Sequence, residues 1–350
     1  MSATGALQSF AGRRVLITGH TGFKGSWLCL WLSRLGAHVT GFSDSIPTDP
    51  SHFVELKLDV DDRRGDICNP AAVAAAVADA KPDIIFHFAA QSLVRKAYSD
   101  PLTTYRANVL GTLAVLEAAR SNGIGATVLA TTDKVYRNDE SGRRYKEDDE
   151  LGGSDPYSAS KSCAEIMAQS YRDSFLGEGA MLVATVRAGN VVGGGDWAED
   201  RLLPDLMRAA FGGQAALIRN PHSTRPWQHV LDVLAGYLQV GARLLAGDRD
   251  AADAWNLGPM ADSSIRVQDL LDATAARTPQ LRFEIQPDET GRHESALLQL
   301  DSAKAMDRLG WRPRWEGEMI ERTIDWYRAF YERGRIISGD QIDSYQAALD

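Results

Sequence analysis

Residues 13–25, RRVLITGHTGFKG, indicate the fold class of the chain. The segment 13–18 is typical of a short buried strand, and Gly19, Gly22 and Gly25 follow it at three-residue spacing. In such a turn the first glycine permits the tight bend, the second lets backbone approach a pyrophosphate, and the third lets a helix pack against the strand. The stretch therefore predicts a strand, a dinucleotide-binding turn and a helix.

The segments that follow extend this prediction. A helix predicted at 26–35 is apolar over much of its surface and directs its amino end at the phosphate. Asp44 lies just past a second predicted strand, 38–42, close to the spacing at which an acid binds the adenosine ribose. A carboxylate there favours NAD over NADP, because it would repel a 2′-phosphate. Alternatively, Asp44 is a solvated loop acid and Ser43 is the nearer neighbour.

Strands and helices continue to alternate through the first half of the chain. Further strands are predicted at 55–58, 83–88, 126–130 and 181–187, and further helices at 69–80, 98–121 and 319–331. This order predicts an α/β fold, a Rossmann-type doubly wound parallel sheet with a smaller, loop-rich substrate-binding domain. We expect the dinucleotide-binding domain at 12–190, and the mainly substrate-binding domain at 191–335, interleaved with the first. Residues beyond about 335 are predicted to form a polar tail.

Several residues beside the predicted strand ends are candidate dinucleotide contacts. Asp66 and Ile67 could contact the adenine edge, and Ala89 and Ala90 are small enough to leave room for a cofactor. Asn108 either steadies the neighbouring strand ends or satisfies polar groups in the core. The predicted dinucleotide contacts are Gly19, Thr21, Gly22, Phe23, Lys24, Gly25, Asp44, Asp66, Ile67, Ala89, Ala90, Gln91, Asn108, Tyr157 and Lys161.

The candidate catalytic residues begin with Thr132-Asp133-Lys134, which follow a predicted strand. Open α/β sheets place their chemistry at the carboxyl ends of strands. Tyr157 and Lys161 are four residues apart and share one face of a predicted helix. Ionising a phenol of pKa about 10 near pH 7 costs roughly 4 kcal/mol, which an ammonium and a positively charged nicotinamide could largely offset. Tyr-x-x-x-Lys pairs also occur by chance on solvated faces, but this one follows a nucleotide-binding turn.

The second half of the chain contains a candidate substrate-binding region. Arginines, a tryptophan and a histidine lie close together between 219 and 229, where cations could bind a diphosphate and a ring could bind a base or sugar. A surface loop anchored by a buried tryptophan explains that stretch equally well. The predicted substrate contacts are Gln91, Asn190, Trp197, Arg201, Arg219, Arg225, Trp227, His229 and His293.

Composition excludes some classes of function. The net charge of −9, from 38 basic and 47 acidic residues, argues against general binding of nucleic acid or anionic membranes. The three cysteines have no metal-ligand spacing, which predicts no metal site and a reducing compartment. There is no apolar signal segment and no apolar run of about 18 residues. We therefore expect a soluble, cytoplasmic protein.

Taken together, these motifs resemble the extended short-chain dehydrogenase/reductases that modify nucleotide sugars. Within that family TTDKVY, residues 131–136, is similar to the 4,6-dehydratases, because 4-epimerases lack the acid equivalent to Asp133. The finer match is to the dehydratases of CDP-glucose, whose Asp-Lys pair corresponds to Asp133-Lys134. Thymidine-diphosphate-sugar dehydratases have an Asp-Glu pair instead. Similar motifs include LGGSDPYSASKSCAE, RAGNVVGGGDWAEDRLLPD, RNPHSTRPWQHV and LGWRPRW.

The resemblance implies a tightly bound NAD that is regenerated in each cycle. Tyr157 would take the C4 hydroxyl proton while hydride leaves C4, Asp133 would protonate the departing C6 hydroxyl, and Lys134 would act as base at C5. Thr132 would bind the C4 oxygen, and Lys161 would bind the nicotinamide ribose and lower the pKa of Tyr157. As a base Lys134 must be neutral, with a pKa well below the ordinary value of about 10.4.

The resemblance also leaves alternatives. The same scaffold dehydrates or epimerises other nucleotide sugars, and a dinucleotide-sensing regulator would keep the cofactor motif while losing the catalytic one. Family members commonly dimerise through the two long helices near 98–121 and 157–175. We therefore expect a homodimer or a higher homo-oligomer.

Overall fold

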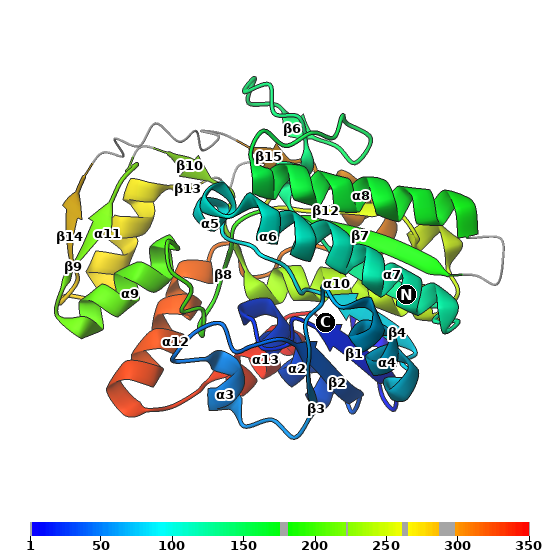
Figure 1. Ribbon diagram of the computed structural model, residues 1–350. Helices are drawn as coiled ribbons and strands as arrows, with labels where there is room; N and C mark the ends of the chain where they lie inside the picture. The colour runs from blue at the N-terminus through cyan, green and yellow to red at the C-terminus, as the bar shows by residue number, and fades with distance from the viewer. Residues whose placement is uncertain (1, 176–180, 222, 261–264, 287–297, 350) are drawn as a thin grey trace.

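The computed structural model describes residues 2–175, 181–221, 223–260, 265–286 and 298–349. Its centre is a parallel sheet of seven strands in the order β12-β7-β5-β4-β1-β2-β3 (Figure 1). The strands are β1 (Arg14–Thr18), β2 (His38–Ser43), β3 (Asp61–Arg64), β4 (Ile84–His87), β5 (Ala126–Ala130), β7 (Leu182–Ala188) and β12 (Ala254–Leu257). The predicted Rossmann-type α/β fold is confirmed.

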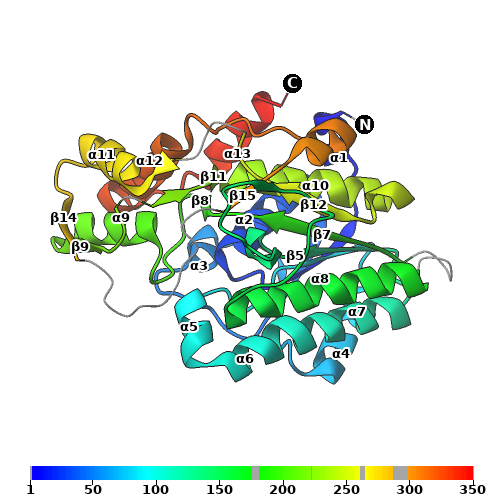
Figure 2. The same ribbon diagram turned by 90° about the horizontal axis from the view of Figure 1, so that it is seen from above.

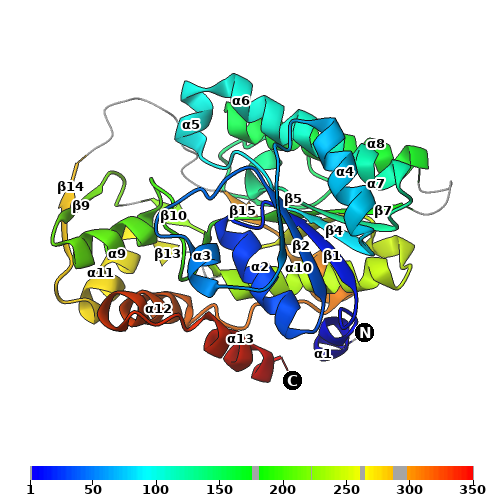
Figure 3. The ribbon, with the colours of Figure 1, turned by 60° about the horizontal axis from the view of Figure 1, so that its bottom comes forward.

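Each central strand is apolar on both faces, because helices cover the sheet from both sides. Val15 and Ile17 of β1 belong to one core cluster, whereas Leu16 between them belongs to the other. The first cluster packs against α1 (Ala3–Gln8), α2 (Phe23–Arg34) and α10 (Val230–Leu245). The second packs against α4 (Pro70–Ala80), α7 (Thr112–Ser121) and α8 (Pro156–Phe175). Figures 2 and 3 show these two helical layers on opposite sides of the sheet.

The helix predicted at 98–121 consists of several segments. They are α5 (Val94–Ser99), α6 (Pro101–Tyr105), a π-helical turn (Arg106–Gly111) and α7. Asp100 separates α5 from α6, and its carboxylate accepts a hydrogen bond from the amide of Thr103. The π-helical turn contains Asn108, a position that the functional site uses.

A smaller lobe lies beside the carboxyl edge of the sheet, at the left of Figure 1. It has its own core cluster, which includes Leu206, Ile218 and Leu270. Its elements are α9 (Leu202–Gly212), β9 (Ala215–Ile218), α11 (Val267–Arg277) and β14 (Arg282–Ile285). Further short strands pair with one another outside the central sheet: β6 (Arg144–Tyr145) with β15 (Gln299–Leu300), β8 (Val191–Val192) with β11 (Gln228–His229), and β10 (Thr224–Arg225) with β13 (Ile265–Arg266). Strand β12 belongs to the predicted substrate-binding domain, 191–335, but pairs with β7 of the predicted dinucleotide-binding domain, 12–190. The division of the chain at residue 190 remains a prediction.

Two local predictions were wrong. The strand expected at 55–58 overlaps the end of a short helix, α3 (His52–Leu56), and the third strand is instead β3. The expected polar tail is an ordered helix, α13 (Ser338–Ala347), which follows α12 (Met319–Arg333). Ile342 and Tyr345 of α13 are fully buried in the main core, so this segment is part of the fold.

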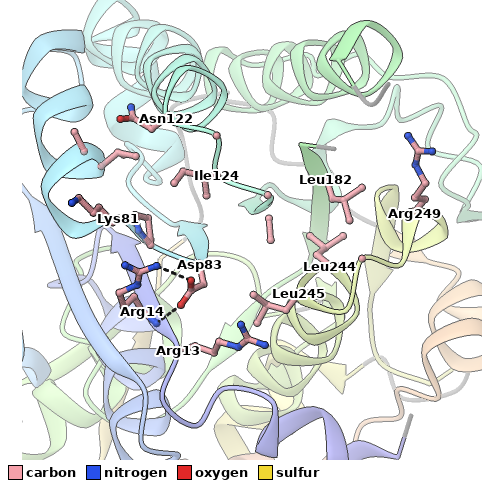
Figure 4. Close-up of a pocket in the computed structure, with 17 residues that line it drawn as sticks. Arg13, Arg14, Lys81, Asp83, Asn122, Ile124, Leu182, Leu244, Leu245 and Arg249 are labelled. Atoms are coloured by element: carbon pink, nitrogen blue, oxygen red, sulfur yellow. Dashed lines mark hydrogen bonds and ion pairs between the residues drawn. The ribbon is translucent and has the colours of Figure 1, made fainter. Parts of the chain in front are cut away.

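A cavity of about 960 Å³ opens at the amino edge of the sheet (Figure 4). Arg13, Arg14 and Lys81 line it, and Arg14 forms an ion pair of 3.0 Å with Asp83. Helices α4, α7 and α10 end beside this cavity, and cations are favourable at helix carboxyl ends because the helix dipole is negative there. The basic residues therefore stabilise the helix carboxyl ends, and their presence in this cavity is explained without a ligand.

Within the described residues, no helix is both long enough and apolar enough to span a membrane.

Candidate functional site

A cavity of about 2130 Å³ lies at the opposite, carboxyl edge of the sheet. It contains most of the residues that the sequence predicted for the cofactor, the chemistry and the substrate. Those that line it are Gly19, Thr21, Gly22, Phe23, Lys24, Gly25, Asp44, Asp66, Ile67, Ala89, Ala90, Gln91, Thr132, Asp133, Lys134, Tyr157, Lys161, Asn190, Trp197, Arg201, Arg219, Arg225 and Trp227. Two distant halves of the chain therefore meet in one space.

The glycine turn leaves no room for side chains at two positions. Gly19 has a φ of 72°, and a Cβ there would lie 2.5 Å from the Ala89 amide nitrogen. A Cβ at Gly25 would lie 2.2 Å from the Gly19 carbonyl oxygen. Helix α2 begins at Phe23 without a side-chain cap, so backbone amides at its amino end remain available to an anion. This geometry fits the pyrophosphate of a dinucleotide.

The expected adenosine side of the cavity lies at the ends of β2 and β3. Asp44 is exposed just after β2, and its carboxylate accepts a hydrogen bond of 2.9 Å from Ser45. The Asp66 carboxylate accepts a hydrogen bond of 2.8 Å from the Cys68 amide. Ile67 is buried against the helical layer. Asp44 thus lies where an acid could bind a ribose hydroxyl, and this role stays a prediction.

Asn108 and Gln91 organise the cavity wall after β4. Asn108 is fully buried outside the cavity lining, and its amide group exchanges hydrogen bonds with the backbone of Gln91 at 2.8 and 2.9 Å. It also donates to the Ser160 hydroxyl of α8. Asn108 therefore supports the chain after β4, which is one of the two roles that the sequence left open. It does not line the cavity, as the predicted cofactor contact would require. The Gln91 side chain bonds to the backbone of Leu93 in its own loop and to the Thr104 hydroxyl of α6.

The catalytic candidates after β5 form a buried polar group. Residues 133–135 make a single 3₁₀ turn, and the Thr132 hydroxyl donates a hydrogen bond of 2.9 Å to the Asp133 carboxylate. Burial raises the pKa of Asp133 above its ordinary range. A Cβ at Gly189 would lie 3.1 Å from that carboxylate, so the loop after β7 approaches it closely. Lys134 lines the cavity and is only partly buried. A raised pKa favours the protonated form of Asp133, which suits proton donation.

Tyr157 and Lys161 project from the first turns of α8. The Asp155 carboxylate caps this helix by accepting hydrogen bonds from the Tyr157 and Ser158 amides at 2.9 and 3.0 Å. Burial raises the pKa of Tyr157 to about 12, although a hydrogen bond with Thr132 acts in the opposite direction. Burial lowers the pKa of Lys161 to about 7. The Lys161 ammonium donates to the Ala130 carbonyl at 2.9 Å. Burial thus outweighs the contacts that lower the Tyr157 pKa, and a further positive charge beside the phenol would be needed to bring that pKa down.

Lys24 brings a further amine into the catalytic part of the cavity. Its ammonium lies 5.8 Å from the centroid of the Phe88 ring and 6.0 Å from that of Tyr237. Burial lowers its pKa to about 8; Arg201 lowers it further and Asp133 raises it. Lys24 therefore lies close enough to the catalytic acid to interact electrostatically with it.

The predicted substrate residues surround the outer part of the cavity. Arg219 pairs with Asp200 at 2.9 Å, and Arg201 pairs with Asp196 at 3.4 Å. Trp227 is buried in the core of the smaller lobe. The Trp197 indole donates a hydrogen bond of 3.0 Å to the Tyr331 hydroxyl. Arg225 lies on β10, near enough to lower the pKa of Asp133. The arginines line the cavity and could bind a phosphorylated ligand, whereas both tryptophans are buried.

The position of His229 differs from the prediction. Its ring is fully buried outside the cavity lining, stacks edge-on against Trp315, and caps α10 by accepting a hydrogen bond from the Leu231 amide. Burial lowers the pKa of His229 to about 3, so the ring is neutral. It faces away from the cavity because α10 begins at the next residue and turns the chain into the core. His293 lies outside the described residues.

Sequence reasoning missed a buried ion pair behind the catalytic loop. Glu165 of α8 and Arg187 of β7 form a salt bridge of 2.8 Å with almost no exposure. A possible signal was the position of Glu165, one helical turn after Lys161 on a face that is otherwise buried. The described residues contain no cluster of three or more side chains suited to hold a metal ion.

Known proteins share this whole architecture. A family model described as GDP-mannose 4,6 dehydratase matches residues 16–323. A CDP-glucose 4,6-dehydratase from Salmonella typhimurium is 42% identical over 349 residues, covering 96% of this chain and 97% of that protein. A dTDP-glucose 4,6-dehydratase from Streptomyces antibioticus is 30% identical over 334 residues, covering 90% and 92%.

A solved structure agrees with these similarities. It is DesIV, a dTDP-glucose 4,6-dehydratase from Streptomyces venezuelae with NAD and TYD bound. It superposes with a TM-score of 0.77 at 25% identity, covering 90% of this chain and 97% of that one. The chain therefore belongs to the GDP-mannose 4,6-dehydratase family, and the resemblance seen in its motifs is confirmed.

Proposed function

We propose that the protein is an NAD-dependent 4,6-dehydratase that converts CDP-glucose to CDP-4-dehydro-6-deoxyglucose. The observation that carries the proposal is the convergence of Thr132, Asp133, Lys134 and Tyr157 in one cavity with the glycine turn. The 42% identical relative is a CDP-glucose 4,6-dehydratase, which supports the cytidine nucleotide. We further propose that residues 12–190 mainly bind the dinucleotide and residues 191–335 mainly bind the nucleotide sugar.

The residues present fit NAD. The open amino end of α2 would bind the pyrophosphate, Asp44 the adenosine ribose, and Lys161 the nicotinamide ribose. Bound NAD would supply a hydride acceptor at C4, a positive charge beside Tyr157, and the hydride that is later returned to C6. That charge would lower the pKa of Tyr157 from about 12 towards the working range.

The side chains can divide the remaining proton transfers among themselves. Tyr157 would take the proton of the C4 hydroxyl while Thr132 binds the same oxygen. The resulting 4-keto group acidifies the proton at C5, which Lys134 would remove. Asp133, whose pKa is raised by burial, would donate its proton to the departing C6 hydroxyl, which leaves as water. The net reaction is loss of one water without net oxidation.

We also propose that the protein forms a homodimer through α6, α8 and the π-helical turn between α6 and α7. Leu102, Leu110 and Ile166 on these neighbouring segments are 70%, 55% and 59% exposed. Large apolar side chains grouped on one helical surface are typical of a contact between proteins. The cytoplasmic location stays a prediction.

A panel of nucleotide sugars tests the proposed function. The purified protein is incubated with CDP-glucose, dTDP-glucose, UDP-glucose or GDP-mannose, and the products are analysed by mass spectrometry. We expect loss of water from CDP-glucose without stoichiometric consumption of added NAD, and no reaction with a Tyr157→Phe variant. A product of unchanged mass would indicate a 4-epimerase, and preferential dehydration of another nucleotide sugar would overturn the assignment of CDP-glucose.

A further inference from the structure

We propose that the buried pair Glu165–Arg187 positions the catalytic loop by holding residues 131–136 at both ends. This inference rests on the proposed function for its kinetic part. The loop carries Thr132, Asp133 and Lys134, and it contains one short 3₁₀ turn with little regular hydrogen bonding of its own. Its conformation must therefore be fixed by contacts with the surrounding elements.

Glu165 holds the beginning of the loop. Its carboxylate accepts a hydrogen bond of 2.5 Å from the Thr131 hydroxyl on one oxygen, and bonds of 2.8 Å from Thr185 and from Arg187 on the other. Glu165 is 1% exposed and Arg187 is 3% exposed. Burial opposes ionisation of Glu165, but Arg187 and the two hydroxyls hold its pKa below the usual range. A charged carboxylate thus connects α8, the end of β5 and β7.

Arg187 holds the end of the loop. Its guanidinium donates hydrogen bonds to the Tyr136 hydroxyl at 2.7 Å and to the Glu147 carbonyl at 2.9 Å. The Tyr136 hydroxyl in turn donates to the Asn256 side chain of β12 at 2.7 Å. Thr131 and Tyr136, the two residues that flank the catalytic segment, are therefore tied to opposite members of one ion pair.

The same helix also positions Lys161. Lys161 lies one turn before Glu165 on α8, and its ammonium bonds to the Ala130 carbonyl next to Thr131. The Ser162 hydroxyl donates to the Val135 carbonyl at 2.8 Å, which adds a third connection between α8 and the loop. A displacement of α8 relative to β5 would thus move Lys161 and Asp133 together. Proton transfer is sensitive to such movements, because a misplacement of about 1 Å can cost about a hundredfold in rate.

The alternative is that the pair only stabilises the fold, and Thr131 allows the two roles to be separated. Thr131→Val removes the hydroxyl that bonds to Glu165 but leaves both charges in place. Thr127→Val is the matched control, because Thr127 is a buried threonine of β5, the strand that leads into Thr131, and its hydroxyl has no partner among the described residues. Thr131→Ser restores the hydroxyl. Glu165→Gln is a less specific variant, because it leaves Arg187 buried without a counter-charge and destabilises the whole fold.

For Thr131→Val we expect kcat for water loss from CDP-glucose to fall about tenfold or more, with KM within about twofold of the parent. Thr131→Ser should recover most of the rate, and Thr127→Val should behave like the parent. Hydrogen exchange of the amides of residues 131–136 is measured in parallel, without substrate. It should become faster in Thr131→Val than in Thr127→Val.

The kinetic measurement depends on the proposed function, whereas the hydrogen-exchange measurement does not. If the parent does not dehydrate CDP-glucose, the proposed function is wrong, and hydrogen exchange alone decides the positioning role. If Thr131→Val loses no more kcat than Thr127→Val, or if the exchange of residues 131–136 is the same in both variants, the pair has only a structural role and the inference is overturned.

Discussion

Asp133, the proposed catalytic acid, shows how the surroundings of one residue change its acidity. Its carboxyl is buried at the end of β5 beside the Thr132 hydroxyl, and burial raises its pKa. Asp133→Asn keeps the shape and a hydrogen bond but has no acidic proton to donate. We expect this variant to oxidise the sugar at C4 and then stall, with water loss slowed about a hundredfold or more. Nicotinamide absorbance and mass spectrometry of the quenched sugar measure the two steps separately.

A variant of Lys134 tests the second proton transfer, the removal of the C5 proton. Lys134→Met should still permit oxidation but slow the exchange of the C5 proton with deuterated solvent. Lys146→Met is a suitable control, because Lys146 is an exposed lysine of the following loop that does not line the cavity. Normal water loss in Asp133→Asn would show that Asp133 is not the acid. Parental C5 exchange in Lys134→Met would place the base elsewhere.

Individual residues were predictable from the sequence where a motif fixes their direction. Tyr157 and Lys161 share a helix face at any tilt of that helix, and Asp133 follows a strand whose end must meet the cavity. His229 and Asn108 carry no such constraint. His229 ends the two-residue strand β11, so the sequence leaves its direction open, and only the start of α10 at Val230 turns it into the core. The pairing of Glu165 with Arg187 was equally inaccessible, because it depends on the packing of α8 against β7.

At the scale of elements, most of the buried strands were predictable, whereas the short buried strand β12 and the charged edge strand β3 were missed. Strands covered on both sides are continuous apolar runs, which the sequence displays directly. Strand β3 (Asp61–Arg64) consists entirely of charged residues at the edge of the sheet, and it is a strand because β2 supplies its hydrogen bonds. Helix α13 was missed although Ile342, Tyr345 and Leu349 recur at helical spacing. Its polar residues obscured that narrow apolar face.

The attachment of α13 gives a prediction about stability and pH. Asp232 of α10 accepts hydrogen bonds from the Arg314 amide at 2.6 Å and from the Tyr345 hydroxyl at 2.8 Å. Burial raises its pKa from 3.8 to about 6. The folded protein therefore binds this proton more tightly than the unfolded chain does. The contribution of Asp232 to stability is greatest below pH about 4 and falls by about 3 kcal/mol as pH rises through about 6.

Asp232→Asn should remove this pH dependence, because an amide oxygen can accept the same hydrogen bonds without titrating. Urea unfolding between pH 4 and 7 measures it as the change in the free energy of unfolding. The parent should lose more stability over this range than Asp232→Asn, whereas Asp325→Asn, at an exposed position of α12, should follow the parent. Parallel pH profiles for the parent and Asp232→Asn would contradict the argument.

At the scale of the whole molecule, the two edges of the sheet differ in their electrostatics. Helices end at the amino edge, where Arg13, Arg14 and Lys81 complement their dipoles (Figure 4). Helix α2 begins at the carboxyl edge, where its amino end faces the large cavity. The parallel arrangement of strands thus favours anionic ligands at one edge. This asymmetry follows from topology, and it could be predicted once the alternation of strands and helices was recognised.

The surface formed by α6, the π-helical turn and α8 is the subject of the last prediction. Leu102, Leu110 and Ile166 are exposed on it, and burying large apolar side chains is favourable by about 25 cal/mol per Å² of apolar surface. A second copy of the chain presents the same surface, so a two-fold contact would bury both sets together. We expect light scattering to show a dimer, and the double variant Leu110→Asp/Ile166→Asp to be monomeric, because each dimer would bury four carboxylates. Val54→Asp, at an exposed position of α3, should remain dimeric. A monomeric parent, or a double variant that dimerises as well as Val54→Asp, would exclude this surface as the interface.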